Sequence, residues 1–344
     1  MLLTTLCYIE KDDSYLMLHR DKKEKDLSND MWIGVGGKFE YGESPLECLK
    51  REVREETGLT LNTVKFRGIV TFHSIDNSEE LSEYMFLYTS DSFSGELAEC
   101  DEGSLKFIPK NELSKLYFWS GDEIFLKLIR DNVDFFDLKL DYRGKTLKSV
   151  VLNGRNMELF DQLGEDFEPT GIVRERSVAH ELGYLHRTVH IWVVRRENGR
   201  LKVLLQKRAM NKDSYPGYYD ISSAGHIMAG DDYMISALRE IREEIGIAAN
   251  ETDIIFIGKR RTNHRTEFYG RPFINNEISN IYLFDMTGRS DTIFELQKEE
   301  VEEVCWFDYR EITDEIYTGR LKNCIFLDEW ELLRQFDGEE EKNV

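Results

Sequence analysis

Residues 37–59, GKFEYGESPLECLKREVREETGL, and residues 225–247, GHIMAGDDYMISALREIREEIGI, are two copies of one acidic pattern. Each copy begins with a glycine, five residues, a carboxylate and seven further residues. Each then continues as Arg-Glu-aliphatic-x-Glu-Glu-x-Gly-aliphatic. Two matches of this length in one chain indicate an internal duplication, in which the acidic stretch is the centre of each half.

A helix over residues 44–57 places Glu52, Glu55 and Glu56 within an arc of about 100° on one face, because successive residues turn by about 100°. Such carboxylates repel: two unit charges about 4 Å apart cost about 4 kcal/mol at an effective dielectric near 20. A hard divalent cation removes this cost, and Mg²⁺ favours one or two carboxylates with water and substrate phosphates. The spacing therefore predicts a metal site. The alternative is a solvated acidic helix face, in a chain with 66 acidic residues.

The glycines and the arginine of the first copy support this interpretation. Gly36 and Gly37 allow the backbone to approach a metal and a phosphate closely. We expect Arg51 to hold Glu43, which fixes the loop against the helix. Gly58 is suited to a helix C-terminus.

The pattern resembles the Nudix box of Mg²⁺-dependent hydrolases that act on nucleoside diphosphates linked to another group. In the second copy Asp231 takes the place of the first carboxylate, and we expect it to bridge to Arg239. The resemblance implies metal binding by Gly36, Glu52, Glu55, Glu56, Glu240, Glu243 and Glu244. It implies catalytic roles for Arg51, Glu52, Glu55, Glu102, Arg239, Glu240 and Glu243. Mg²⁺ is the expected cofactor, and Mn²⁺ is expected to substitute for it.

Strand-like runs flank each copy, and each half ends near a helical stretch, at about 110–130 and about 310–336. This order predicts an α+β fold with a mixed sheet, and the resemblance implies two Nudix-fold α/β/α sandwiches in tandem. Residues 134–153 indicate a hairpin with its turn at Arg143-Gly144, which closes the first domain. We predict a first domain over 1–153 and a second over 157–344.

The first half also resembles the 8-oxo-dGTP diphosphatases of the MutT type, through WIGVGGKFE at 32–40 and WSGDEIF at 119–125. The resemblance implies that Trp119 stacks on the purine and Asp122 hydrogen-bonds its edge. The alternative is a core or capping role for Trp119 and an N-cap role for Asp122. Ile33 stands where the mammalian enzymes have a base-reading Asn. The remaining expected substrate-binding residues are Lys38, Arg20 and, in the second half, Arg208.

The second half, through YPGYYDISSAGHIMAGDD at 215–232, resembles the isopentenyl-diphosphate-isomerase-like branch. Ala224 stands at the position of the isomerase thiol, which argues against isomerisation. His226 and Glu277 match isomerase metal ligands, His180 and His186 lie one residue short of the spacing, and Asn275 replaces a second glutamate. The alternative for these histidines is structural or surface hydrogen bonding. The cluster RRTNHR at 260–265 is a candidate phosphate clamp or a solvated hairpin loop.

These features predict a Mg²⁺-dependent pyrophosphohydrolase. The first domain is expected to convert 8-oxo-dGTP or another nucleoside triphosphate to a monophosphate and pyrophosphate, and the second to hydrolyse a substrate not yet identified. Isoprenyl-diphosphate isomerisation and nucleotide sensing are the alternatives for the second domain.

Composition limits the partners. A net charge of −21 argues against duplex nucleic acid, since that binding depends on neutralising phosphates with Lys and Arg. Five cysteines without a CxxC spacing favour a reduced, cytoplasmic compartment. No signal peptide or membrane-length apolar run is visible, so we expect nucleotide or other diphosphate substrates and no membrane partner. The resemblance also implies a possible homodimer.

Overall fold

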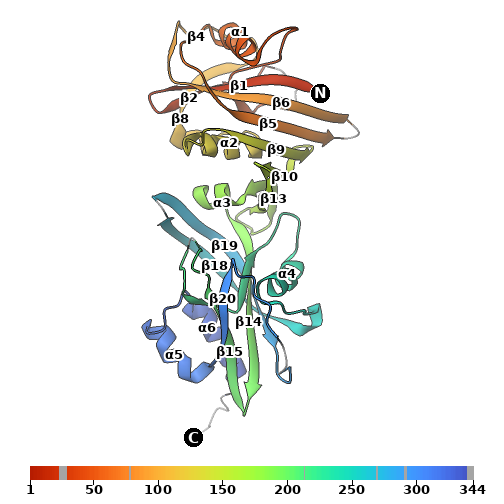
Figure 1. Cartoon of the computed structure of the whole chain (residues 1–344), viewed down its shortest axis with the longest axis vertical. Coiled ribbons are helices and arrows are strands. Elements are labelled where there is room, and N and C mark those ends of the chain that lie inside the picture. The colour runs from red at the N-terminus through yellow and green to blue at the C-terminus, as the bar shows by residue number, and fades with distance from the viewer. Residues whose placement is uncertain (23–28, 77–78, 213, 269, 290–292, 339–344) are drawn as a thin grey trace. The chain divides into compact units, whose positions relative to one another are not determined.

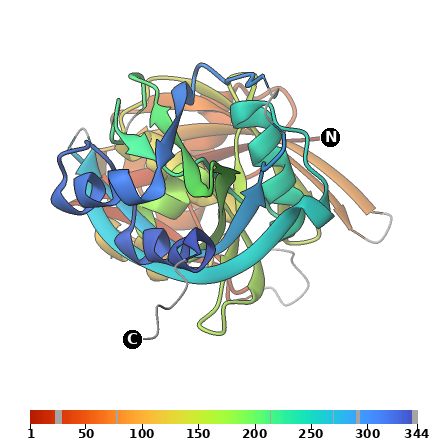
Figure 2. The same ribbon diagram turned by 90° about the horizontal axis from the view of Figure 1, so that it is seen from below.

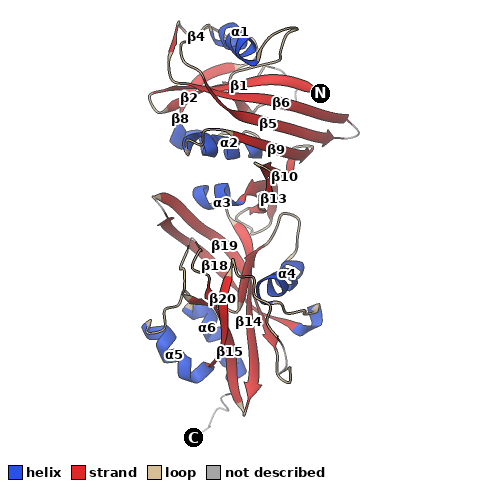
Figure 3. Cartoon of the chain, in the orientation of Figure 1, coloured by secondary structure: helices blue, strands red, loops and turns tan. Residues whose placement is uncertain are grey.

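The computed structural model describes residues 1–22, 29–76, 79–212, 214–268, 270–289 and 293–338. The chain divides into two compact units. The first comprises Met1–Leu159 with Gly171–Val178, and the second comprises Phe160–Thr170 with Ala179–Val344. Both are rich in strands, with a few helices beside each sheet (Figures 1 and 3).

The first unit is built on a nine-stranded mixed sheet in which β1 pairs in parallel with β6 and β5 with β9. In spatial order its main path is β11 (Arg155–Asn156), β10 (Thr146–Leu152), β9 (Phe136–Arg143), β5 (Lys65–Asp76), β6 (Glu79–Ser90), β1 (Leu2–Lys11), β2 (Ser14–His19) and β3 (Trp32–Ile33), and β8 (Ser104–Pro109) pairs with β2. A small second sheet joins β4 (Thr60–Leu61) to β7 (Phe93–Ser94). The predicted hairpin over 134–153 is confirmed as β9 and β10.

Helices α1 (Pro45–Thr57) and α2 (Ser120–Arg130) lie on opposite faces of this sheet (Figure 1), and a 3-10 helix, η1, covers Lys110–Lys115. α1 begins with a capping box, in which Ser44 and Glu47 each accept a hydrogen bond from the other's backbone. It ends at Gly58, whose φ of 76° is costly for any residue with a Cβ. The predicted C-terminal glycine is thus confirmed. Leu49 and Val53 bury its apolar face against β1 and β2.

The second unit is built on a seven-stranded mixed sheet in which β14 and β19 are parallel. Its main path is β16 (Tyr219–Asp220), β15 (Arg200–Arg208), β14 (His186–Glu197), β19 (Arg271–Asp285) and β18 (Ile254–Phe268), while β17 (Ser223–His226) pairs with β14 and β20 (Val301–Asp308) with β15. β12 (Leu159–Leu163) and β13 (Pro169–Glu175) form a separate two-stranded sheet.

The acidic helix of this unit, α4 (Tyr233–Ile245), starts at the N-cap Asp232 and ends at Gly246 with φ 75°. The other helices are α3 (Arg176–Leu182), η2 (Glu251–Asp253), α5 (Tyr309–Thr318), α6 (Leu327–Leu332) and α7 (Arg334–Asp337). In the turned view, α4 (teal) and the helices α5 to α7 (blue) flank the sheet on different sides (Figure 2). Two buried clusters, one on α4 and one on α5 and α6, fill the space on either side.

This architecture confirms the predicted α+β class with two mixed sheets in tandem. Two local interpretations are wrong. Residues 260–265 lie inside β18 rather than in a hairpin loop, and the N-cap of α2 is Trp119, with Asp122 inside the first turn. No helix among the described residues is both long and apolar enough to cross a membrane.

Candidate active sites and metal centre

The loop before α1 is tied to the helix by one arginine. Arg51 donates from Nε and Nη2 to the two oxygens of Glu43 at 2.6 and 2.9 Å, and from Nη2 to the Lys38 carbonyl at 2.9 Å. Two parallel bonds to a carboxylate fix its orientation as well as its position. The expected contact between Arg51 and Glu43 is therefore present. Its effect is to hold the glycine loop against the acidic helix.

The three glutamates of α1 face different surroundings. Glu52 and Glu56 line a cavity of about 520 Å³, whereas Glu55 has a side chain 61% exposed and contacts Arg51 at 3.1 Å. Glu56 is 9% exposed and accepts a hydrogen bond from Gly36 N at 3.2 Å. Burial, with the charges of Glu102 and Glu52, raises the pKa of Glu56 to about 8. An acidic group in this setting favours a bound cation.

A built Cβ shows why glycine is needed in the loop. At Gly37 a Cβ would lie 2.4 Å from the carboxylate of Glu52, and at Gly225 it would lie 2.0 Å from that of Glu240. No side chain fits there unless the carboxylate moves. Both loops therefore press the backbone against a glutamate, as a shared metal and phosphate site requires. The carboxylate-rich donor set suits Mg²⁺.

The second acidic centre repeats the first. Arg239 donates to Asp231 at 2.8 Å and to the His226 carbonyl at 2.9 Å, so the expected Asp231 bridge is present. Glu244, which is 6% exposed, accepts from Ala224 N at 3.1 Å, and burial raises its pKa to about 8. Glu240 is partly buried, like Glu52 of the first unit, and Glu243 is exposed, like Glu55.

The remaining predicted residues of the first unit meet in the same cavity. Besides Glu52 and Glu56, its lining includes Arg20, Lys38, Gly36, Ile33, Glu102, Trp119 and Asp122. Arg20 lies 3.4 Å from Glu102. Trp119 and Asp122 are each 8% exposed. Sequence positions about 100 residues apart are thus brought to one site, next to the acidic helix.

The second unit has a smaller cavity, of about 150 Å³. Arg208 lines it and is held by Asp220 at 3.0 Å and by Ser214. Of the basic cluster at 260–265, His264 is the member found in the described lining. Arg260 instead donates to Asp328 and stacks over the Phe326 ring. The cluster is therefore not a common phosphate clamp.

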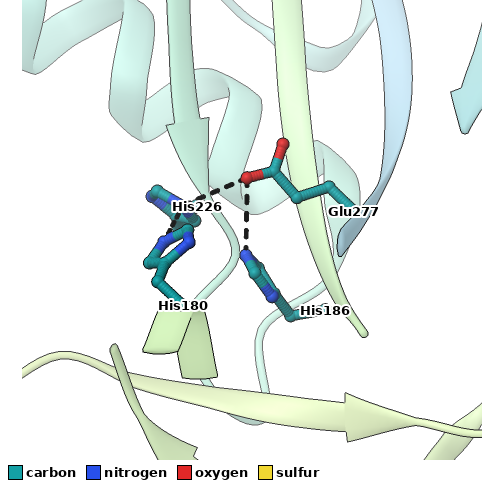
Figure 4. Close-up of side chains that lie close together, drawn as sticks. All are labelled: His180, His186, His226 and Glu277. Atoms are coloured by element: carbon teal, nitrogen blue, oxygen red, sulfur yellow. Dashed lines mark hydrogen bonds and ion pairs between the residues drawn. The ribbon is translucent and has the colours of Figure 1, made fainter. Parts of the chain in front are cut away.

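A second group of candidate ligands lies beside this cavity (Figure 4). His180, His186, His226 and Glu277 each offer one ligand atom, and these four atoms lie within 4.8 Å of one another. His180 Nε2 is 3.2 Å from His226 Nε2, while His186 Nε2 is buried and 3.6 Å from Glu277 Oε1. Phe160 stacks on His186 and His226.

The charge of Glu277 is stabilised by this arrangement. Burial opposes it, but the surrounding histidines hold its pKa below the usual value. Three imidazoles and one carboxylate suit a transition-metal cation such as Zn²⁺ better than Mg²⁺. His186 Nε2 also lacks a hydrogen-bond partner among the described residues, which fits a ligand atom. The structure thus gathers histidines for which the sequence left a purely structural role open.

The register of the strands relates the two units position by position. Leu2 pairs with Glu83 as His186 pairs with Glu277, and Thr4 pairs with Lys38 as Thr188 pairs with His226. The ligand positions of the second unit are therefore occupied in the first by Leu2, Lys38 and Glu83.

Known proteins resemble each half of this chain. The model of the NUDIX domain matches residues 2–129 and again 184–325. The chain belongs to the NUDIX family. It is 42% identical over 159 residues to Nudix hydrolase 3 of Arabidopsis thaliana. This alignment covers 45% of the chain and 20% of that relative. It is 37% identical over 128 residues to an uncharacterized Nudix hydrolase of Clostridium acetobutylicum, covering 37% of this chain and 59% of that one.

Each of these alignments thus spans less than two thirds of the relative. The oxidized purine nucleoside triphosphate hydrolase of Danio rerio is 29% identical over 107 residues, or 31% of this chain and 67% of its own. Among solved structures, the MutT protein of Bacillus halodurans has 27% identity and a TM-score of 0.40, covering 45% of this chain and 99% of that one. The matched domains place the chain in a family of hydrolases that act on pyrophosphate bonds and generally use divalent metals.

His190 was not predicted from the sequence. It lies on β14, lines the second cavity and contacts Glu329 of α6. A single histidine in an apolar strand carries no spacing signal, and its partner lies 139 positions away. Only the tertiary structure brings the two together.

Proposed function

We propose that the first unit is a Mg²⁺-dependent diphosphatase of 8-oxo-dGTP or a related nucleoside triphosphate, releasing a nucleoside monophosphate and pyrophosphate. The observation that carries this proposal is the cavity of about 520 Å³, which joins Glu52 and Glu56 to Trp119 and Asp122. Its volume lies within the range of about 300–1,000 Å³ of small-molecule sites. One end therefore suits the phosphates with their metal, and the other a base.

The base end combines an aromatic ring and a buried acid. Trp119 meets Phe72 and Tyr142 edge-on, with centroids 5.2 and 5.0 Å apart, and contributes to the cavity wall. Burial, then the charges of Glu123 and Glu83, raises the pKa of Asp122 well above its usual value. A protonated Asp122 can donate a hydrogen bond to an acceptor on the base edge. Ile33 makes the nearby wall apolar.

At the phosphate end, we assign metal binding to Gly36, Glu52, Glu55 and Glu56. A bound Mg²⁺ supplies Lewis-acid stabilisation of the phosphate oxygens and a water of lowered pKa. Arg51 and Glu43 position the loop. Glu102 and Glu56 are the candidates to accept the proton of the attacking water. Lys38 and Arg20 line the same cavity and are the candidates to contact the phosphates.

For the second unit we propose hydrolysis of a different diphosphate at Glu240, Glu243 and Glu244, with Arg239 in the role of Arg51. The histidine group at His180 favours an additional transition-metal site. That group also favours isoprenyl-diphosphate isomerisation as a second candidate. Ala224 offers no thiol to protonate carbon, which makes hydrolysis the better assignment.

The test is hydrolysis of 8-oxo-dGTP and dGTP with Mg²⁺ by the wild type, Glu56→Gln and Glu244→Gln proteins. We expect Glu56→Gln alone to abolish 8-oxo-dGTP turnover. Equal rates on both nucleotides would contradict specificity for the oxidised base and point to Ile33. Turnover that survives Glu56→Gln but not Glu244→Gln would contradict the assignment of the units.

A further inference from the structure

The cavity of the second unit contains a histidine backed by a fully buried carboxylate. Both oxygens of Glu329 lie close to His190 Nδ1, at 2.8 and 2.9 Å, and the Glu329 side chain is 1% exposed. His190 lines the cavity, whereas Glu329 lies behind it. Because Nδ1 is committed to Glu329, among the described residues Nε2 is the ring nitrogen left for a ligand.

This pair is adjacent to the hydrolytic centre. His190 lies directly opposite Ala224 in the β14–β17 ladder, and residues opposite each other in a sheet have Cβ atoms about 5 Å apart on the same face. Ala224 N in turn holds Glu244 at 3.1 Å. A substrate whose diphosphate lies at Glu244 therefore has its next group beside His190.

The cavity limits the size of that group. A dry cavity of about 150 Å³ is known to hold a molecule the size of benzene, and this one is about 150 Å³. A single ring fits within this volume, whereas a nucleoside would extend beyond it. The lining combines Phe268, Phe273 and Phe326 with the polar side chains of His190 and Arg208. The apolar rings match the faces of a small ring and the polar groups match its oxygens, a combination that a sugar provides.

We propose that the second unit hydrolyses a diphosphate carried by a single sugar-sized polar group. Water adds to one phosphorus, the phosphoanhydride P–O bond breaks, and the sugar monophosphate and inorganic phosphate are released. His190, positioned by Glu329, binds the sugar-sized group through Nε2–H. This inference rests on the proposed hydrolysis by the second unit and names its substrate class. The residue of the first unit that corresponds to His190 is Leu6. Cys7 pairs with Val35 as Ile191 pairs with Ser223, and Leu6 and His190 directly precede Cys7 and Ile191. The larger first cavity thus has no imidazole at this point.

The dyad keeps the imidazole in its donating form. With Nδ1–H given to Glu329, Nε2 donates only when the ring is protonated. Burial disfavours that form, but Glu329 outweighs it and the pKa of His190 is raised. The charged or titratable groups around the ring and in the cavity lining include Glu329, Glu277, Asp220, Arg208, Arg260, His264, Tyr215 and Cys324.

The experiment uses the full chain carrying Glu56→Gln, so that the first unit is silent, with Mg²⁺ and three probes: 5-phosphoribosyl 1-diphosphate, isopentenyl diphosphate and dGTP. We expect the ribosyl probe to be hydrolysed with the highest kcat/KM. His190→Leu, which copies the first unit, should lower that value about 10- to 100-fold, the effect of losing one charge-assisted hydrogen bond. His190→Leu should leave dGTP turnover by the first unit unchanged when Glu56 is present.

Glu329→Gln is the test of positioning. It retains the shape of the side chain but removes the charge that supports the protonated His190 ring, so the pKa of His190 should fall. As the pH is raised, activity on the ribosyl probe should therefore be lost at a lower pH than in the parent chain. An unchanged pH profile would overturn the role of Glu329. Preference for isopentenyl diphosphate or dGTP, or full activity of His190→Leu, would overturn the proposal. If the Glu56→Gln chain hydrolyses none of the three probes, the substrate class named here is wrong. If that chain hydrolyses a probe and adding Glu244→Gln does not reduce this turnover, the assigned hydrolytic centre is wrong instead.

Discussion

The buried carboxylate Glu56 makes the metal-free first unit sensitive to pH. Its pKa is raised from 4.5 to about 8, chiefly by burial. A raised pKa means that the folded state favours the protonated form. This contribution to stability is therefore fully present below about pH 4.5 and is lost as the pH rises through about 8. At about 1.4 kcal/mol per pKa unit, the loss is about 5 kcal/mol.

The Glu56→Gln variant should remove this loss, since the amide does not ionise. Hydrogen exchange measured by mass spectrometry on peptides of β1 and β5, in EDTA and corrected for intrinsic exchange, reads the unfolding free energy of the first unit separately. We expect the wild-type value to fall by about 4 kcal/mol between pH 4.5 and pH 8 relative to Glu56→Gln, since the full loss of about 5 kcal/mol is reached only above pH 8. Mg²⁺ at about 100 times its dissociation constant should restore about 2.7 kcal/mol at pH 8.

Glu55→Gln is the matched control, because the side chain of Glu55 is 61% exposed and sits on the same helix. It should leave the difference between pH 4.5 and pH 8 as in the wild type. If Glu56→Gln shows the same fall as the wild type, Glu56 is not the source and the argument from its burial fails. Hydrogen exchange in peptides of β14 reports the unfolding free energy of the second unit. The pH dependence of that free energy should change in Glu244→Gln and not in Glu56→Gln.

Three further outcomes follow from the geometry. Gly37→Ala would put a Cβ 2.4 Å from the Glu52 carboxylate, so nucleotide turnover by the first unit should fall at least about 100-fold while the second unit's exchange pattern stays intact. His186→Ala should remove one equivalent of tightly bound Zn²⁺ or Mn²⁺ in metal analysis of the dialysed protein, whereas Glu244→Gln should retain it; retention by both would refute the histidine site. Asp231→Glu should strengthen the contact with Arg239 and stabilise the second unit by about 0.5–1 kcal/mol in urea denaturation, and a loss of stability would contradict the bridge.

The sequence predicted features that depend on local spacing. Helix α1, its glycine end and the Arg51–Glu43 contact follow from residues within one loop and one helix. The hairpin of β9 and β10 follows from its turn. These elements are fixed by hydrogen bonds and packing among neighbours, which a pattern can reveal.

Features that depend on register between distant strands were harder to predict. The histidine group needs β14, β17, β19 and α3 in one alignment. The sequence singled out its four members by resemblance, but a spacing one residue short left a structural role for the histidines open. Residues 260–265 were misjudged because a long strand at the edge of a sheet can carry as many charges as a loop. The capping alternative for Trp119 is confirmed, whereas the N-cap alternative for Asp122 is wrong, because Asp122 suits an N-cap by residue type alone.

The two units use the same backbone to hold two different sites. Each has a glycine loop pressed against a glutamate, and each has a buried third glutamate that accepts a backbone N–H, from Gly36 or Ala224. The differences lie on the neighbouring strands, where Leu2, Lys38 and Leu6 of the first unit stand in the places of three histidines of the second. Leu2, Lys38 and Leu6 line the first cavity and His190 lines the second, so the cavity walls differ while the acidic helices are alike. The duplication therefore lets one chain hold the same acidic arrangement twice, beside two cavities with different linings.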